Sequence, residues 1–265
     1  MKNLVIIKLG GSIITDKKAT KPVFRKSVVK RICNEIFEAQ KQANISLILV
    51  HGAGSFGHPY AKKYRLNEGY FGKESSLGIS LTKKFVLELN LRVVNEMISS
   101  GLNAVLVESS AVAITSNGKI ETFNQNPIEA LLKQDIIPVL SGDVVTDSKK
   151  GVSILSGDQI AVYLASKLRA KTVIFASDVD GIFDKNPKLH KDAKLIKEIN
   201  NSNYEAIVNT IQTHNTSDVT GEMKGKIMTI RENLSGVPVI ITNGLKPANI
   251  KHALLNRING TRILF

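Results

Sequence analysis

Short apolar runs alternate with longer amphipathic segments along almost the whole chain of 265 residues, and this alternation constrains the fold more than any other feature. Strand-length apolar runs are typical of buried parallel strands, whereas apolar residues at helical spacing indicate helices that cover a sheet. The pattern predicts an α/β fold with a mainly parallel central sheet and helices on both faces. The expected strands are residues 4–9, 46–50, 104–107, 136–140, 172–176, 237–241 and 262–265. The clearest expected helices are residues 25–42, 79–100, 158–168 and 225–234.

Two further stretches predict β-hairpins outside this alternation. Residues 112–122 surround an Asn-Gly turn, and residues 144–155 surround a Lys-Lys-Gly turn. Glycine-containing turns between β-branched residues are typical of hairpins. We expect both hairpins to project from the sheet edge and to help cover a substrate site. No linker rich in Pro, Gly or Ser divides the chain, so we expect one continuous domain with two lobes, residues 1–170 and 171–265.

A glycine-rich segment follows the second expected strand and ends in histidine: residues 50–58 read V-H-G-A-G-S-F-G-H. A similar segment, K-L-G-G-S at residues 8–12, ends the first strand. Glycines let the backbone approach an anion closely and expose N–H groups to it, and the N-terminus of a following helix adds positive potential. Two such loops at the ends of two strands predict a site for phosphoryl transfer.

Several charged residues near these loops are candidates for that site. Lys8 ends an apolar strand, where an ammonium group is costly unless it meets an anion such as phosphate. His58 ends the glycine loop and is better placed to donate to a phosphate than His51, for which a structural role is the alternative. Asp158 is placed either in the site or as the N-cap of the helix that follows it. Three further residues carry no signal when taken alone: Lys17, Asp178 and Lys226.

Other classes of site find little support. Residues 52–57 also satisfy G-x-G-x-x-G, the dinucleotide fingerprint, but they follow the second strand, and the next expected strand begins only at residue 104. A Walker A sequence is absent, which excludes an ordinary P-loop kinase. No group of Cys or His residues has metal-ligand spacing and no Ser-His-Asp arrangement is legible, so neither metal hydrolysis nor covalent catalysis is predicted.

Charge and composition set further limits. Lys and Arg number 36 against 23 Asp and Glu, a formal net charge of +13 that makes a polyanionic partner worth weighing. The basic residues are spread along helices and aromatic residues make up 5% of the chain, so we expect no nucleic-acid partner. No apolar run reaches membrane-spanning length and no signal-peptide pattern follows Met1, so we expect a cytoplasmic protein with no membrane partner. Cys33 is the single cysteine, and we expect a buried thiol.

Five motifs, taken in order, resemble the amino acid kinase superfamily, and the resemblance spans essentially the whole chain. They are Lys8-Leu9-Gly10-Gly11-Ser12, His51-Gly52-Ala53-Gly54, Ser156-Gly157-Asp158, Asp178-Val179-Asp180-Gly181 and D-V-T-G-E-M-K-G-K at residues 218–226. Within that superfamily, the S-F-G-H ending at residues 55–58, with T-D-K at residues 15–17, is similar to the isopentenyl phosphate kinases of archaeal type. His58 is the specific mark, because relatives that phosphorylate carboxylates or UMP lack a histidine there.

The resemblance implies a fold and a reaction. The fold would be a three-layer αβα sandwich that forms a homodimer, with the acceptor site in residues 1–170 and the nucleotide site in residues 171–265. The reaction would be ATP-dependent phosphorylation of isopentenyl phosphate to isopentenyl diphosphate, in isoprenoid biosynthesis by a mevalonate pathway, with Mg2+ bridging ATP oxygens and no protein residue predicted as a metal ligand. Alternatives are a related kinase that acts on another small phosphate, a phosphonate or a carboxylate, and, outside catalysis, a binding module that is either a nucleotide sensor or a basic nucleic-acid binder.

The resemblance also implies roles for individual residues. The predicted catalytic residues are Lys8, Lys17, His58, Asp158 and Lys226. The predicted acceptor-binding residues are Ala53, Gly54, His58 and Gly157. The predicted ATP-binding residues are Lys8, Leu9, Gly10, Gly11, Ser12, Gly54, Asp178, Gly221 and Lys226. In this scheme the Asp158 carboxylate orients two lysine ammonium groups.

Two positions depart from the family pattern. Ala53 stands where many relatives have a third glycine, which requires a negative φ at that residue. Glu222 replaces the second glycine of T-G-G-M, so its carboxylate is expected to turn outward or to meet a lysine such as Lys224. For an alkyl tail, we expect the helix at residues 79–86 to close the pocket, the alternative being that it packs into the core. The candidate wall residues are Phe71, Leu77, Ile79, Leu81, Phe85 and Val86.

Overall fold

The computed structural model describes residues 3–16, 21–213 and 218–265, with the backbone alone for residues 212, 213 and 218–222. The strands of its main sheet are β1 (Asn3–Leu9), β2 (Ile45–His51), β3 (Ala104–Leu106), β6 (Ile137–Ser141), β9 (Thr172–Ser177), β12 (Glu198–Asn200), β13 (Val239–Asn243) and β14 (Gly260–Leu264). Their order is β12-β14-β13-β9-β1-β2-β6-β3, and neighbours run parallel except β13 and β14. All seven predicted strands are present, each within two residues of its predicted ends. β12, which has three residues, was not predicted.

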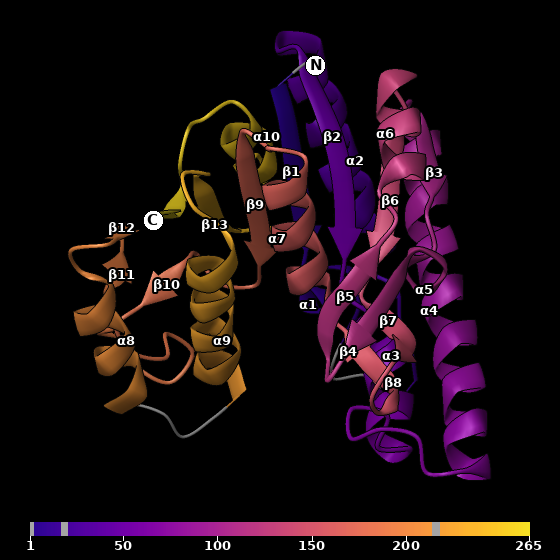
Figure 1. Ribbon diagram of the computed structural model, residues 1–265. Coiled ribbons are helices and arrows are strands. Elements are labelled where there is room, and N and C mark those ends of the chain that lie inside the picture. The colour runs from indigo at the N-terminus through magenta and orange to yellow at the C-terminus, as the bar shows by residue number, and fades with distance from the viewer. Residues whose placement is uncertain (1–2, 17–20, 214–217) are drawn as a thin grey trace.

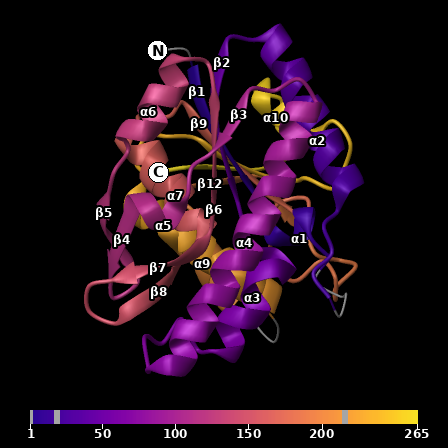
Figure 2. The same cartoon turned by 90° about the vertical axis from the view of Figure 1, so that its right-hand side faces the viewer.

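The residues of β1 explain why this sheet is covered on both faces. Leu4 and Ile6 belong to the hydrophobic core on one face, whereas Val5, Ile7 and Leu9 belong to the core on the other. Because successive side chains point to opposite faces, a strand that is apolar at every position needs a helical layer on each side. Figures 1 and 2 show the resulting three layers. The predicted αβα sandwich is confirmed.

Four helices contribute to the core on the Leu4 face: α6 (Asn126–Lys133), α7 (Gly157–Lys167), α8 (Tyr204–Thr213) and α9 (Asp218–Asn233). Those on the other face are α1 (Gly11–Ile14), α2 (Lys26–Gln42), α3 (Gly54–Lys63), α4 (Lys73–Ser99) and α10 (Asn249–Leu254). Cys33 on α2 is buried, as predicted, and burial raises the pKa of its thiol to about 12. Among the described residues, no helix is long and apolar enough to cross a membrane.

The predicted starts of two helices are wrong. α4 begins at Lys73 rather than at residue 79, and α9 begins at Asp218 rather than at residue 225. The missed first turns are mainly polar, so they lack the apolar spacing that marks a helix in sequence. In α4 a tertiary contact accounts for the extension: a Cβ atom on Gly78 would lie 2.3 Å from Cβ of Tyr64, so only glycine lets this turn pack there.

Both predicted hairpins are present, and they join into one small sheet instead of projecting separately. The first consists of β4 (Ala113–Ser116) and β5 (Lys119–Phe123), and the second of β7 (Asp143–Asp147) and β8 (Gly151–Leu155). β4 pairs with β7 through Thr115 and Asp147. The Asp147 carboxylate accepts from four backbone N–H groups and from the Thr115 hydroxyl, which ties both turns together. A short pair of strands, β10 (Ile182–Phe183) and β11 (Leu195–Ile196), was not predicted.

Residue 171 lies between the strands of the two halves of the main sheet. β12, β14, β13 and β9 come from the chain after that residue and form one half, whereas β1, β2, β6 and β3 come from the chain before it and form the other. The hydrogen-bonded contact between β9 and β1 joins the halves. The main sheet is therefore continuous across both parts of the chain.

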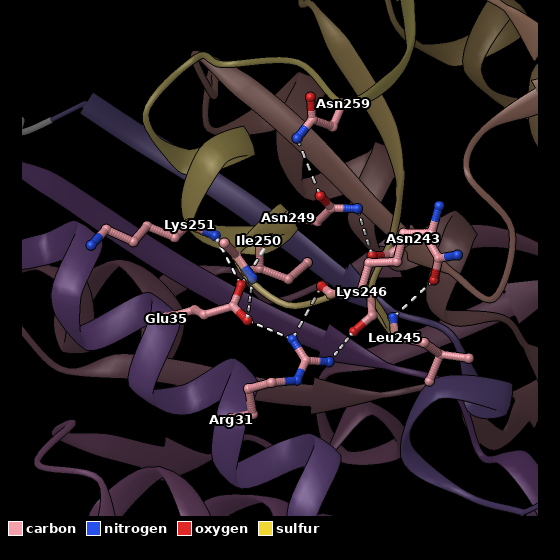
Figure 3. Close-up of polar contacts among 11 residues, drawn as sticks. Arg31, Glu35, Asn243, Leu245, Lys246, Asn249, Ile250, Lys251 and Asn259 are labelled. Carbon is pink, nitrogen blue, oxygen red and sulfur yellow. Dashed lines mark hydrogen bonds and ion pairs between the residues drawn. The ribbon is translucent and has the colours of Figure 1, made fainter.

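Glu35 on α2 fixes the segment that follows β13 (Figure 3). Its buried carboxylate accepts from three backbone N–H groups at the start of α10, those of Ala248, Ile250 and Lys251, at 3.0–3.2 Å. Arg31, one turn earlier, lies 2.5 Å from Glu35 and donates to two carbonyl groups of the loop before α10 at 2.6 and 3.3 Å. Ala248 has φ +65°, a left-handed conformation that is unfavourable for alanine, so these contacts hold a loop that would otherwise relax.

Candidate active site

A cavity of about 480 Å³ opens at the carboxyl ends of β1, β2, β6 and β9, where open parallel sheets bind their ligands. Four segments at or just after the ends of these strands line it: residues 10–12, 52–53, 142–143 and 176–178. The start of α7, one side of α3 and α4, the end of β8 and part of α9 complete the walls. In Figure 1 these strand ends point downward, between α9 and α3.

The two glycine loops meet at this cavity. A Cβ atom on Gly11 would lie 2.7 Å from Cα of Gly54, and one on Gly52 would lie 2.9 Å from the backbone nitrogen of Gly11. A side chain at either position would force the loops apart, so close approach of two backbones requires these glycines. Gly54 has φ +50°, and a Cβ there would lie 2.2 Å from the Thr15 hydroxyl oxygen. Ala53 has φ −68°, which confirms the negative angle that an alanine requires.

Helix N-termini bring unpaired backbone donors to the same place. The first N–H groups of a helix have no acceptor within it. In the part of the chain that the structure describes, no other atom accepts from the N–H groups of Gly11, Ala53, Gly54, Gly157 and Asp158. These groups lie at or just before the starts of α1, α3 and α7. Such a set of donors is suited to the oxygens of phosphate groups.

Asp158 lies between two lysine side chains that come from distant parts of the chain. Lys8 Nζ is 2.7 Å from its Oδ1, and Lys226 on α9 donates to its Oδ2. Burial raises the pKa of Asp158, but the charges of Lys226 and Lys8 outweigh this effect and hold the pKa well below its usual range. The cluster therefore keeps one negative and two positive charges, and its excess positive charge faces the cavity.

Asp158 does not cap α7, which was the alternative role predicted for it. Ser156 is the N-cap: its hydroxyl accepts from the Gln159 N–H at 3.1 Å, and the Gln159 side chain accepts from the Ser156 N–H at 3.0 Å. This reciprocal capping box already satisfies the helix start. The Asp158 carboxylate is therefore left to bind the lysines.

His58 and an apolar wall lie on the side of the cavity formed by α3 and α4. His58 stands in α3, one turn after its first residue, and not in an extended loop. The wall beyond it is lined by Ala61, Thr82, Val86, Ile154 and Leu155. This wall gives the cavity a charged end and an apolar end.

Of the six candidate wall residues, Val86 alone is among those lining the described cavity, so the prediction for the others is corrected. Phe71 and Leu77 are 61% and 52% exposed, and Phe85 stacks on Tyr60 with ring centroids 4.5 Å apart. Ile79 packs with a small core cluster beside β7 and β8. The helical period brings only one side of α4 to the cavity, which the one-dimensional pattern could not specify.

On the opposite side, Asp178 follows β9 and lines the cavity beside Lys188. Their side chains form an ion pair of 2.5 Å, with Lys188 about half exposed. Asp180, two residues later, points to a different contact and binds Lys246 at 2.8 Å and the Asn243 amide at 2.9 Å. Sequence reasoning missed Lys188, because a lysine ten residues after Asp178 has no periodic relation to it.

A second ion cluster, centred on the cavity-lining residue Asp143, was also missed. Asp143 at the start of β7 binds Lys83 of α4, and Lys83 also reaches Glu108 at 2.5 Å and the Ser110 hydroxyl at 2.8 Å. Burial raises the pKa of Asp143 to about 6 in spite of the lysine. Lys83 thus ties the helix that carries Thr82 and Val86 to the small sheet.

Four of the predicted site residues either do not line the cavity or lie outside the residues that the structure describes. The Leu9 side chain is buried in the core, and its carbonyl accepts from the Gly52 N–H at 3.0 Å. Gly54 is buried at the start of α3. Gly221 lies in α9, two residues before the cavity-lining Met223, with only its backbone described. Lys17 lies outside the described residues, as does the side chain of Glu222.

The donors of the site fit phosphate better than metal. Among the described residues, no three His, Cys, Asp or Glu side chains are grouped so that they could hold a metal ion. The cavity instead gathers the ammonium groups of Lys8, Lys188 and Lys226 with backbone N–H groups and one imidazole. Such a donor set binds the oxygens of a polyphosphate.

Comparisons with known proteins agree with this geometry. The model of the amino acid kinase family matches residues 3–243. The chain is 38% identical to isopentenyl phosphate kinase of Methanothermobacter thermautotrophicus over 98% of each chain, and 36% identical to that of Methanocaldococcus jannaschii over 99% of each. Among solved structures, it is similar to an isopentenyl phosphate kinase with a TM-score of 0.84 and 35% identity, over 98% of this chain and 99% of the other.

Proposed function

The chain belongs to the amino acid kinase family, and we propose that it phosphorylates isopentenyl phosphate with ATP to form isopentenyl diphosphate. The observation that carries this proposal is a single cavity with two unlike ends. One end gathers ammonium groups and backbone N–H donors, and the other is the apolar wall of Ala61, Val86 and Ile154. An alkyl monophosphate, with an anionic head and a short hydrocarbon tail, complements both ends.

In the proposed reaction, an oxygen of the acceptor phosphate attacks the γ-phosphorus of ATP and ADP leaves. That oxygen is already ionised, so no residue has to remove a proton from it. Catalysis then consists of bringing mutually repelling phosphates together and neutralising their charge. Lys8 and Lys226 neutralise the transferring phosphoryl group, and Asp158 holds both ammonium groups in place. His58 and the N–H groups of Ala53 and Gly54 hold the acceptor.

The two halves of the sheet supply different sides of this reaction. We assign the acceptor to residues 1–170, which contribute His58 and the apolar wall, and the nucleotide to residues 171–265, which contribute Asp178 and Lys226. Lys188 joins the nucleotide side through its contact with Asp178. Lys17 and Gly221 remain proposed ligands of the phosphates. Mg2+ would reduce the charge of ATP by binding its oxygens, with no protein ligand assigned to it.

An ATP-consumption assay tests the proposal. ADP formation should depend on isopentenyl phosphate, and 31P NMR should show the diphosphate product. UMP, glutamate and N-acetylglutamate, offered at the same concentrations, represent the other substrates of this family. Faster turnover of any of these would replace the proposed acceptor, and ATP binding without turnover of any acceptor would favour a nucleotide sensor.

We further propose that the protein is a homodimer that pairs through α4 and the edge strand β3, which face the viewer in Figure 2. Leu87, Leu91 and Ile98 form a stripe on one side of α4 and are 39%, 49% and 56% exposed, and Val105 on β3 is 40% exposed. Their helical spacing of four and seven residues aligns them. Contiguous exposed apolar residues of this kind mark interfaces.

Leu91→Glu should therefore convert the dimer into a monomer at micromolar concentration, because it places a carboxylate in the apolar stripe. Light scattering after size-exclusion chromatography measures the mass. Leu189→Glu, which changes another exposed leucine far from α4 in sequence, is the matched control and should stay dimeric. A wild-type monomer, or a dimeric Leu91→Glu variant, would contradict this interface.

The apolar wall should set the length of the alkyl chain. Val86→Ala and Ile154→Ala together should raise kcat/KM for geranyl phosphate by on the order of tenfold and lower it for isopentenyl phosphate, since a lost apolar contact costs about 1–3 kcal/mol whereas removing a clash favours the longer tail. Leu77→Ala is the matched control, because Leu77 lies on the same helix but does not line the cavity. An unchanged ratio of the two substrates in the double variant would place the tail elsewhere.

A further inference from the structure

Two buried polar atoms beneath the second glycine loop have no hydrogen-bond partner among the described residues. One is Nε2 of His51, the last residue of β2, whose side chain is fully buried. The other is Oδ1 of Asn90, a buried residue on α4. Buried polar atoms are nearly always paired, because an unpaired one costs the full free energy of its desolvation. Both atoms belong to side chains that the proposed reaction does not use.

The other ring nitrogen of His51 shows where its proton is. Nδ1 lies 3.1 Å from the carbonyl oxygen of Gly52. A carbonyl oxygen can only accept, so Nδ1 must carry the proton of this hydrogen bond. Burial lowers the pKa of His51 to about 4, so the ring is neutral near pH 7. Nε2 therefore presents a bare lone pair and needs a donor.

Asn90 is the residue that supplies this donor. Its Nδ2 lies 3.5 Å from the Ser141 hydroxyl oxygen, and the Asn90 side chain lies close enough to the His51 ring to raise the pKa of that ring. The nitrogen and oxygen of an amide occupy equivalent positions, and their partners decide which is which. With the NH2 group toward His51, the amide donates to Nε2, and its oxygen accepts from Ser141. Both unpaired atoms are then satisfied.

The Gly52 carbonyl is the point at which this buried network reaches the site. In a trans peptide the C=O group and the following N–H group point to opposite sides. A Gly52 carbonyl turned toward the ring therefore turns the Ala53 N–H away from it, and Gly52 and Ala53 both line the cavity. The His51 carbonyl also accepts from the Gly142 N–H at 2.8 Å, so the same residue anchors a second cavity-lining segment.

We propose that His51 is a positioning residue: Asn90 holds its ring in the Nδ1–H form, and the ring fixes the Gly52–Ala53 peptide so that the Ala53 N–H binds the acceptor phosphate. The identity of the acceptor rests on the proposed function, whereas the presence of a phosphate site at this loop does not. Because the N–H contacts the acceptor before and during transfer, its loss raises KM for the acceptor more than it lowers kcat.

Three substitutions distinguish the proposed positioning role of His51 from a role in core packing alone. His51→Asn keeps an N–H donor near the place of Nδ1, whereas His51→Leu keeps apolar volume without a donor. Asn90→Asp replaces the donor to Nε2 by a carboxylate, which draws the ring proton to Nε2 and leaves Nδ1 facing the Gly52 carbonyl with a lone pair. We expect KM for isopentenyl phosphate to rise about tenfold or more in His51→Leu and Asn90→Asp, and to stay within about threefold of wild type in His51→Asn.

Thr172→Val is the control for lost stability, because Thr172 is buried at the opposite end of β9 and its hydroxyl bonds only the neighbouring carbonyl among described atoms. It should lower Tm without changing KM.

15N NMR of the wild-type histidine rings should show a neutral Nδ1–H form for His51 between pH 5 and 8. Inorganic phosphate should bind more weakly to the variants in which KM rises. An Nε2–H ring in the wild type, or equal KM values in His51→Asn and His51→Leu, would overturn the proposal. Wild-type protein that binds phosphate but does not turn over isopentenyl phosphate would contradict the proposed function alone.

Discussion

Asp158→Ala will lower kcat by on the order of a thousandfold, and Lys8→Ala will lower it by a comparable factor. The carboxylate lies between Lys8, at 2.7 Å, and Lys226. Without it, two like charges in a largely buried cluster repel each other, and neither ammonium group stays where the transferring phosphoryl group needs it. The three side chains therefore act as one unit, and the double variant should lose little more activity than either single variant.

Single-turnover rates at saturating ATP and isopentenyl phosphate measure these effects without product release. Asp158→Asn, which keeps the shape but not the charge, checks that the loss does not come from misfolding. Glu88→Ala removes the carboxylate of an exposed ion pair on α4, 2.7 Å from Arg92, and is the matched control that should stay near wild type. If the Lys8→Ala and Asp158→Ala losses multiply fully in the double variant, the two residues act independently and the shared cluster is wrong.

The fold could be predicted from sequence where local signals and tertiary structure agree. The four successive apolar residues of β1 from Leu4 to Ile7 can be buried only in a sheet covered on both faces, so the sandwich follows from residues such as Ile6 and Ile7. The same logic fails where a contact from far along the chain decides the outcome. Near the start of α4, Tyr64 packs so closely on Gly78 that no side chain fits there, and β12 is a three-residue strand that pairs with β14. Neither has a local signal of its own.

The residues of the candidate site also divide into those that could be predicted from sequence and those that could not. Lys8, Gly10 and Gly11 stand at the end of the first strand, where the sequence pattern predicts a phosphate site, whereas only the family resemblance linked Asp158 to them; all four line the cavity. The contact between Lys83 and Asp143 could not be predicted, because these residues are 60 apart in sequence and meet only through the packing of α4 on the small sheet. Lys188 could not be predicted either, because its spacing of ten residues from Asp178 has no periodic meaning. His51 was weighed as a structural residue, and its hydrogen bond to Gly52 gives that role a direct link to the site.

His58→Ala will lower kcat/KM for isopentenyl phosphate about a hundredfold or more. His58 stands four residues after Gly54 in α3, and helical side chains lean toward the N-terminus. We therefore expect its imidazole to lie near the N–H groups of Ala53 and Gly54, which have no acceptor among the described residues, so that the ring and these N–H groups bind the same phosphate. A donor that strengthens its bond as charge develops in the transition state is commonly worth a few kcal/mol, which corresponds to this loss.

The changes in kcat and in the two KM values show whether His58 binds the acceptor or supports the structure of the whole site. KM for ATP should change little in His58→Ala, because the residue lies on the acceptor side, and His58→Gln should recover part of the rate because its amide keeps a donor at similar reach. The assay is steady-state turnover with each substrate varied in turn, with unfolding monitored to confirm equal stability. Near wild-type kcat/KM in His58→Ala would remove His58 from the mechanism. An equal rise in KM for both substrates would instead make it a residue that shapes α3 and the glycine loops as a whole.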